Sequence, residues 1–277
     1  MTKSNNNTLL IFGQNFEGYY VPSSNGSYIE QIRRFRIIDN GTDLSVKIKS
    51  SKPSVPDPNY RRRDLNVVPV VRVIDKKLKG EFVALSGVFT PDPVSPGIWT
   101  VPVEITANGT PSMADPSAPG TFKQGMNNYV CPTIGMFSKA SGNMYTVIMG
   151  GISFGFFQNG QFQTDIEIPF INQITTIRID KQGNYKQYLM NSQYPVILST
   201  QSNAGNPLLF GAGAFFMPSN HISTYSNGVM KFDKIKKPTV VGYIVGGIQS
   251  TLANTIDPTT DSAASNYIFE VIVKPHH

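Results

Sequence analysis

Short runs of strand-forming residues alternate with polar turns along most of the chain. Residues 33–38 and 44–48 are such runs on either side of an Asp-Asn-Gly turn, and residues 175–179 and 185–189 flank an Asp-Lys-Gln-Gly turn. The glycine in each turn supplies the positive φ that a hairpin requires. Almost no segment has apolar residues at the 3.6-residue spacing of a helix over ten or more positions. The pattern therefore predicts β-hairpins, with helices short or absent.

The hydrophobic pattern also repeats. Two similar segments contain Pro69 and Pro132, which are 63 residues apart. Each is followed by an apolar run that ends in glycine, and these glycines, Gly87 and Gly150, are again 63 residues apart. Two landmarks at one offset indicate an internal repeat.

Further copies complete the repeat. The Gly-ended run recurs at 9–13 and 241–248, and the proline segment recurs loosely at 208–218. Each unit then consists of an inner strand, a Gly-ended strand and one or two outer strands. Four units account for nearly the whole chain; the first lacks its inner strand and the last its outermost strand. Closure into a ring explains both, because the C-terminal segment then completes the first unit.

This organisation predicts an all-β fold, a β-propeller of few blades. Four repeats are detected, and the irregular third interval leaves room for a fifth blade. Closure removes free sheet edges, and glycines make room where blades crowd near the axis. A large β-sandwich is the alternative, but it does not predict repeated Pro and Gly-Gly landmarks. The predicted single domain covers residues 9–275, after a disordered or vector-derived segment 1–8 and before 276–277, two histidines interpreted as a tag remnant.

Two Gly-Gly strands carry a family resemblance. The runs at 149–152 and 245–248 resemble the kelch repeat, without its usual later Tyr and Trp. Together with 60–66, 122–129 and 241–250, they make most of the chain similar to uncharacterised exported bacterial proteins with kelch-like β-propeller repeats. The resemblance implies a kelch-like propeller and secretion or display at the cell surface, and it transfers no activity.

Composition excludes several classes of function. One cysteine and three histidines among 277 residues are too few for a disulfide framework, a multi-cysteine zinc site or a His-based metal cage. We predict no metal and no cofactor. The net charge of +6 favours anionic partners, but the basic residues form no long stripe, which argues against nucleic acid.

Targeting features are few. No run of 18 apolar residues occurs, so no membrane insertion is predicted. The polar N-terminus lacks the hydrophobic region of a signal peptide. We expect a secreted or surface-exposed bacterial protein whose leader has been removed.

A candidate ligand site follows from the propeller prediction, because the residues just before the inner strands converge on one face. Arginine forks bind carboxylate or phosphate, and asparagine amides bind sugar hydroxyls. The predicted ligand-binding residues are Arg61, Arg62, Arg63, Asp64, Asn66, Lys123, Asn127, Asn128 and Tyr129, with Asn203 and Asn206 from a third unit. The alternative is structural: such residues also cap turns, and Arg63 can pair with Asp64.

We therefore predict a non-catalytic binding module that recognises a glycan or another anionic polymer at the channel mouth. A propeller glycoside hydrolase is the second hypothesis; it needs two carboxyl groups, Asp64 and a second one that the sequence leaves open, with Asp115 as one candidate. A scaffold that binds a surface protein through blade edges or loops is the third, and it is favoured if side chains block the channel and Arg63 is paired with Asp64. Cys131 is expected to be a buried, inert thiol, and His221 an exposed loop residue.

Overall fold

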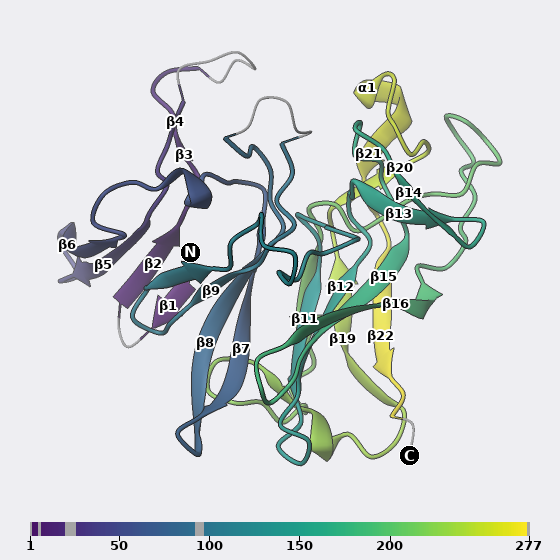
Figure 1. The fold of residues 1–277 in the computed structure, drawn as a ribbon. Coiled ribbons are helices and arrows are strands. Elements are labelled where there is room, and N and C mark those ends of the chain that lie inside the picture. Colours follow the sequence, from purple (N-terminus) through teal and green to yellow (C-terminus); the bar gives the residue numbers. More distant parts are fainter. Residues whose placement is uncertain (1, 5–6, 20–25, 92–96, 276–277) are drawn as a thin grey trace. The chain divides into compact units, whose positions relative to one another are not determined.

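The computed structural model describes residues 2–4, 7–19, 26–91 and 97–275. They form an all-β protein, as predicted, whose chain divides into two compact units (Figure 1). Unit 1 comprises residues 1–67 and 81–123, and unit 2 comprises residues 68–80 and 124–277, where a single domain over 9–275 was predicted. The predicted tag remnant, His276 and His277, lies outside the described residues.

Unit 1 begins with an antiparallel sheet in the order β1-β2-β5-β6. Its strands are β1 (Thr2–Ser4), β2 (Asn7–Ile11), β5 (Ile32–Asp39) and β6 (Leu44–Lys52), with a small hairpin of β3 (Gln14–Asn15) and β4 (Ser27–Tyr28) inserted after β2. The segment 1–8, predicted to be disordered, thus contributes β1 and the start of β2. The 3-10 helix η1 (Pro58–Tyr60) follows β6.

A second sheet has the order β10-β9-β8-β7. Its strands are β7 (Asn66–Ile74), β8 (Lys77–Leu85), β9 (Val103–Ile105) and β10 (Pro111–Met113), and residues 68–80 of the β7–β8 hairpin are counted with unit 2. The core of unit 1 is formed by residues from both of its sheets. It consists of Leu9, Phe12, Ile32, Phe82, Ala84, Val103 and Ile105.

Unit 2 contains two larger sheets, visible in teal, green and yellow in Figure 1. One has the order β16-β15-β12-β11-β18 and the other the order β17-β19-β22. The strands of the first are β11 (Thr133–Phe137), β12 (Met144–Met149), β15 (Gln173–Ile179), β16 (Tyr185–Gln193) and β18 (Met230–Lys231). Those of the second are β17 (Phe215–Pro218), β19 (Thr239–Val245) and β22 (Ile268–Val273).

Small elements fill the connections of unit 2. They are the hairpins β13 (Gly155–Gln158) with β14 (Gln161–Thr164) and β20 (Ile248–Ser250) with β21 (Ser262–Ala264), the 3-10 helix η2 (Phe232–Lys234) and the helix α1 (Pro258–Asp261). The inner faces of the two larger sheets meet in one core. Phe210, Val241 and Ile244 are among its buried residues.

The repeat seen in the sequence corresponds to four meanders. In each, the second strand ends at a glycine with positive φ: Gly13 (+96°), Gly87 (+103°), Gly150 (+64°) and Gly246 (+70°). In three meanders a small hairpin follows that glycine. The glycines of the repeat therefore have a backbone conformation that L-residues rarely adopt. Their predicted place at the ends of strands is confirmed.

The ends of the repeat differ from the prediction in one respect. The first meander does have an inner strand, β1, which pairs with β2, so the prediction that it lacks one was wrong. The last meander has three strands among the described residues and ends at β22, as predicted. Every sheet of the described chain has an open strand order, and closure into a ring stays a prediction.

Candidate functional site

The predicted site segment Arg61–Asp64 lies between η1 and β7; its first residues are extended, and Asp64 has a left-handed backbone with φ of +52°. Asp57 caps η1 by accepting a hydrogen bond from the backbone N–H of Asn59 at 2.9 Å, and proline at the next position starts the turn. The chain then extends, and Arg63 forms a β-bridge with Val88. Side chains of an extended segment alternate in direction. Arg62 accordingly points into the core, while Arg61 and Arg63 lie nearer the surface.

Arg62 is a buried structural residue. Its Nη1 donates to the carbonyl oxygens of Ser86 (3.2 Å) and Val101 (3.3 Å), and its guanidinium lies 4.3 Å from the centre of the Trp99 ring. Burial lowers the pKa of Arg62 to about 9, so the group remains charged at neutral pH. The side chain is 0% exposed, and its Nη2 donates to the sulfur of Met113 at 3.2 Å. Arg62 therefore stabilises the interior of unit 1 through buried contacts.

Arg61 and Arg63 each stack on an aromatic ring. The Arg61 guanidinium lies 4.4 Å from the Tyr28 ring centre, and that of Arg63 lies 4.4 Å from the Phe89 ring centre. The two rings are tilted against each other with centroids 6.2 Å apart. We call these four residues the arginine–aromatic ladder. Cation–π contacts of this kind hold a guanidinium in place while its edge stays available for hydrogen bonds.

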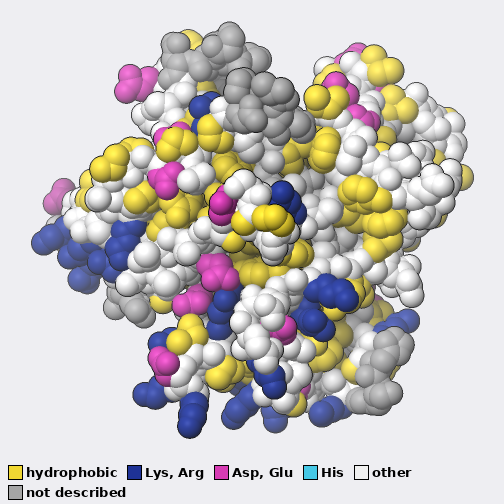
Figure 2. All heavy atoms as spheres, in the orientation of Figure 1, with side chains coloured by type: hydrophobic (Ala, Val, Ile, Leu, Met, Phe, Trp, Pro, Cys, Tyr) yellow, Lys and Arg dark blue, Asp and Glu magenta, His cyan; other side chains and the backbone are white. Residues whose placement is uncertain are grey.

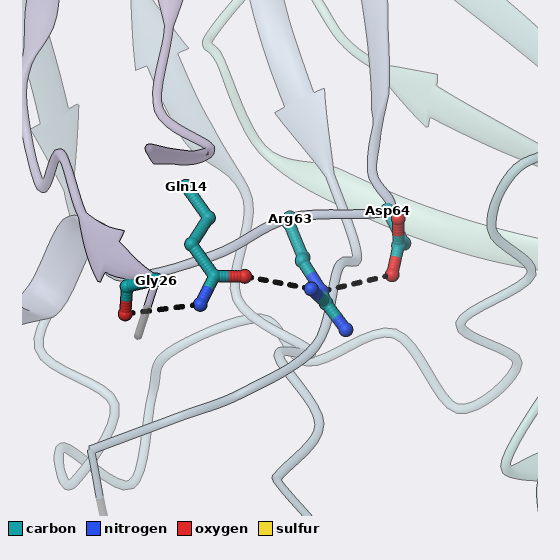
Figure 3. A network of polar contacts seen from close by, with 4 residues as sticks. All are labelled: Gln14, Gly26, Arg63 and Asp64. Carbon is teal, nitrogen blue, oxygen red and sulfur yellow. Dashed lines mark hydrogen bonds and ion pairs between the residues drawn. The ribbon is translucent and has the colours of Figure 1, made fainter. Parts of the chain in front are cut away.

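Figure 3 shows the hydrogen bond and the ion pair that position Arg63. Its Nη1 donates to Oε1 of Gln14 at 2.7 Å, and its Nε lies 3.4 Å from a carboxylate oxygen of Asp64. The amide nitrogen of Gln14 in turn donates to the carbonyl oxygen of Gly26 at 3.1 Å. The Arg63–Asp64 pair, the structural alternative that the sequence suggested, thus exists.

The other predicted residues of unit 1 are Asn66 and Lys123. Asn66 is buried at the start of β7, and Lys123 is exposed.

The asparagines of unit 2 support the turn after β12. Asn127 accepts hydrogen bonds from the backbone N–H of Phe154 (2.9 Å) and the hydroxyl of Ser153 (3.2 Å). Asn128 donates to the carbonyl oxygen of Gly150 at 2.8 Å. Both asparagines are 0% exposed, and Tyr129 is buried beside them in the sequence. In bonding the turn after the second strand of a meander, Asn128 resembles Arg62.

The predicted polar residues of the third repeat, Asn203 and Asn206, form hydrogen bonds with residues 251–261. Asn203 donates to Asp261 at 3.0 Å, and Asn206 donates to the carbonyl oxygen of Thr251 at 3.2 Å. The predicted set is thus distributed over two units, and the side chains of Arg62, Asn128 and Asn206 all donate to backbone carbonyl oxygens of the fold.

The carboxylate of Asp115 also forms hydrogen bonds within its own loop. Asp115 accepts hydrogen bonds from the hydroxyl (2.7 Å) and the backbone N–H (2.8 Å) of Ser117, and these bonds lower the pKa of Asp115. A glycosidase acid needs a raised pKa, so Asp115 lacks that property. Within the described ranges, no three His, Cys, Asp or Glu side chains form a group that could hold a metal ion. Cys131 is buried, as expected.

Sequence reasoning missed a large apolar surface on the sheet β17-β19-β22. Inner residues such as Phe216, Ile244 and Phe269 pack in the core, and the alternate residues of the same strands face outward. The outward set is exposed: Phe215 (74%), Met217 (58%), Tyr243 (41%), Ile268 (67%) and Ile272 (45%). The alternation along Ile268–Val273 does not reveal this surface, because its outward face carries Ile268 and Ile272 as well as Glu270.

Comparison with known proteins adds no family. No protein-family model matches the chain, and no curated protein is detectably similar to it. Within the part of the chain that the structure describes, no helix has both the length and the apolar character needed to cross a membrane.

Proposed function

We propose that this protein is a non-catalytic binding scaffold that takes up an extended segment of a partner protein at the sheet β17-β19-β22. The observation that carries the proposal is the exposed apolar outer face of this sheet. Phe215, Val245 and Ile268 form one apolar cross-strand row, and in the next outward row Met217 and Tyr243 lie beside Glu270, the one charged residue of the face on β22. An exposed apolar face of this kind is typical of an interaction surface.

The edge of the sheet supports the choice of an extended partner. The other three meanders supply four consecutive strands each, whereas this one has three among the described residues and ends at β22. Among the residues that the structure describes, β22 pairs with β19 alone, and its second edge offers backbone N–H and C=O groups that an added strand satisfies. Ile268 and Ile272 lie on that edge strand and provide apolar contacts for alternate side chains of the added strand. We propose as the partner a strand-forming peptide that has apolar residues four positions apart, to lie beside Ile268 and Ile272, and a polar residue between them beside Glu270.

A synthetic peptide tests this proposal. In the preceding meander, β16 occupies the fourth position, so a labelled peptide with the sequence of residues 185–193 is a suitable probe. We expect it to bind the full chain in a fluorescence-anisotropy titration. Ile268→Lys/Ile272→Lys should abolish binding, while Ile256→Lys, at a position that is 89% exposed outside this sheet, should bind like the parent chain. Equal binding by all three proteins would refute the proposal.

A second candidate is recognition of an acidic glycan at the arginine–aromatic ladder. It is favoured by Arg61, whose guanidinium is stacked on Tyr28 but donates no hydrogen bond to another described residue. A uronate or similar carboxylate fits such a guanidinium edge. On an acidic-polysaccharide array we expect Arg61→Ala to lose binding that Arg36→Ala, a variant at an exposed arginine of β5, retains. Binding that both variants retain would refute this candidate.

The finer fold prediction belongs with these proposals. We propose that the four meanders are blades of a kelch-like propeller, supported by their shared strand order and by the glycine that follows each second strand. The resemblance to exported bacterial proteins supports secretion or cell-surface display, where a binding scaffold meets its partners.

A further inference from the structure

The β5–β6 hairpin of unit 1 has two unlike faces. One is mainly apolar and exposed: Val46 (60%) and Ile48 (72%) of β6 lie beside Ile37 (46%) and Phe35 of β5, and Leu44 (72%) lies beside Asp39 at the turn end. The other face is mainly basic and polar, with Arg36 directly opposite Lys47 and Ile38 opposite Ser45. Figure 2 shows the basic side chains gathered where β5 and β6 lie in Figure 1. Three large aliphatic side chains on one strand of this face are exposed to solvent. A contiguous exposed apolar patch of this kind is typical of an interaction surface.

The position of β6 shows how that partner attaches. β6 is the last strand in the order β1-β2-β5-β6, and it pairs with β5 alone in the described chain. It is nine residues long, which is long for an exposed edge. Its second edge is therefore a template for one more antiparallel strand. Because directly opposite residues of paired strands share a face, the new strand must place apolar residues opposite 44, 46 and 48.

The sequence of β6 itself meets this requirement. When residues 43–49 are laid antiparallel to a second copy of themselves with Val46 opposite Val46, Leu44 of each copy lies opposite Ile48 of the other. In the same register Ser45 lies opposite Lys47, and Asp43 lies opposite Lys49. The apolar face then continues across both molecules, and each end of the pairing brings opposite charges together.

Neighbouring registers are worse. A shift that centres the pairing on Lys47 places two lysines directly opposite each other, which destabilises a strand pair. A shift that centres it on Ser45 leaves Ile48 opposite the polar Thr42. A shift by a single residue joins the apolar face of one copy to the basic face of the other. Charge and apolar pattern together select Val46 as the centre.

We propose that two copies of this chain form a symmetric dimer through β6, with the two-fold axis at Val46 and an eight-stranded sheet as the result. A two-fold arrangement is closed, so it covers the edge without starting a fibre. The second copy is chosen over other partners because the strand is complementary to itself in both charge and apolar pattern. This interface lies in unit 1 and does not involve β22, so it is independent of the proposed peptide site.

The first test is the oligomeric state of the full chain, measured by light scattering and sedimentation over a range of concentrations. We expect a dimer for the parent chain. Val46→Lys places two lysines opposite each other at the axis and should give a monomer with an unchanged circular dichroism spectrum. Val55→Lys, at a position in unit 1 that is 71% exposed outside the strand, should remain dimeric. A parent chain that is monomeric throughout, or a Val46→Lys variant that stays dimeric, overturns the proposal.

Disulfide trapping tests the register. Val46→Cys should form a covalent dimer on mild oxidation, because opposite residues of paired strands lie within disulfide reach. Leu44→Cys and Ile48→Cys should each fail alone and cross-link when mixed. The native Cys131 is buried, so background is low. Vesicles with and without phosphatidylserine test the alternative that this hairpin binds a membrane surface: a monomer that binds only the anionic vesicles, and loses that binding in Val46→Asp, overturns the dimer in favour of a membrane-surface role.

Discussion

At the scale of single residues, three consecutive arginines have different roles. Arg61 and Arg63 stack on Tyr28 and Phe89 near the surface, whereas Arg62 is enclosed in the core. Alternation along an extended segment accounts for the difference, and the charges alone do not. In an extended run of arginines, some side chains point into the core. Only the remaining arginines are candidates for a binding surface.

Arg62→Ala should destabilise unit 1 by about 3–5 kcal/mol, because it removes the donors to Ser86 and Val101 and leaves a cavity beside Trp99. Arg61→Ala should cost less than about 1 kcal/mol, since its half-exposed guanidinium bonds to no buried carbonyl. Urea unfolding followed by the fluorescence of Trp99, the single tryptophan, measures both. Similar midpoints for the two variants would contradict this assignment.

Two adjacent glycines separate backbone strain from crowding. Gly246 and Gly247 have φ of +70° and +80°, but a Cβ on Gly246 meets no atom within 4 Å, while one on Gly247 meets the backbone of Ala212 and Ala214 at 2.6 Å. Gly246→Ala should cost about 1–2 kcal/mol, the strain of a left-handed alanine. Gly247→Ala should cost at least about 3 kcal/mol, because backbone must also move. Thermal unfolding followed by circular dichroism compares them; equal losses would mean that crowding is unimportant here.

At the scale of elements, hairpins were predictable and exposure was not. The runs 33–38 and 44–48 became β5 and β6, and those at 175–179 and 185–189 became β15 and β16, because local turn chemistry determines a hairpin. The small hairpins after the Gly landmarks were missed, since their strands have two to four residues. Whether an apolar strand faces core or solvent depends on its distant neighbours, so the exposed faces of β6 and β22 could not be read locally.

The candidate site was predictable only in part, for the same reason. The sequence correctly suggested that Arg63 can pair with Asp64, which are neighbours. It could not reveal Tyr28 and Phe89, which approach from other connections, or the turn-supporting role of Asn128, whose partner Gly150 is 22 residues away. Contacts between distant segments decide whether a polar group is free to bind a ligand.

The turn between β15 and β16 should make unit 2 acid-sensitive. Asp180 accepts hydrogen bonds from the backbone N–H groups of Asn184 and Gln182, both at 2.9 Å, and the bonds from Asn184 lower its pKa most. A depressed pKa means that the carboxylate stabilises the fold above the ordinary value of 3.8 and loses this effect as the pH falls below it. Asp180→Ala should therefore lower the urea midpoint at pH 7 and have a smaller effect at pH 3. The same loss at both values would exclude a role for ionisation.

At the scale of the whole molecule, four meanders in sequence make a prediction about closure. In a ring, the first and last meanders are neighbours; in an open row they are farthest apart. Spin labels on exposed outer-strand residues distinguish the two, one per meander: Lys47, Ser112, Lys186 and Glu270. Pairs of cysteine variants, made in a Cys131→Ser background and diluted with unlabelled protein, report only distances within one chain.

For the proposed propeller we expect the Lys47–Glu270 pair to give a distance as short as the three consecutive pairs, and the two opposite pairs, Lys47–Lys186 and Ser112–Glu270, to give the longest. A Lys47–Glu270 distance that exceeds all the others would rule out the ring and favour an open or sandwich arrangement. The measurement also bears on β22, because a strand that closed onto the first meander within the same chain would not be available to a partner. A closed ring combined with peptide binding at Ile268 and Ile272 would require that the partner strand enters without displacing that closure.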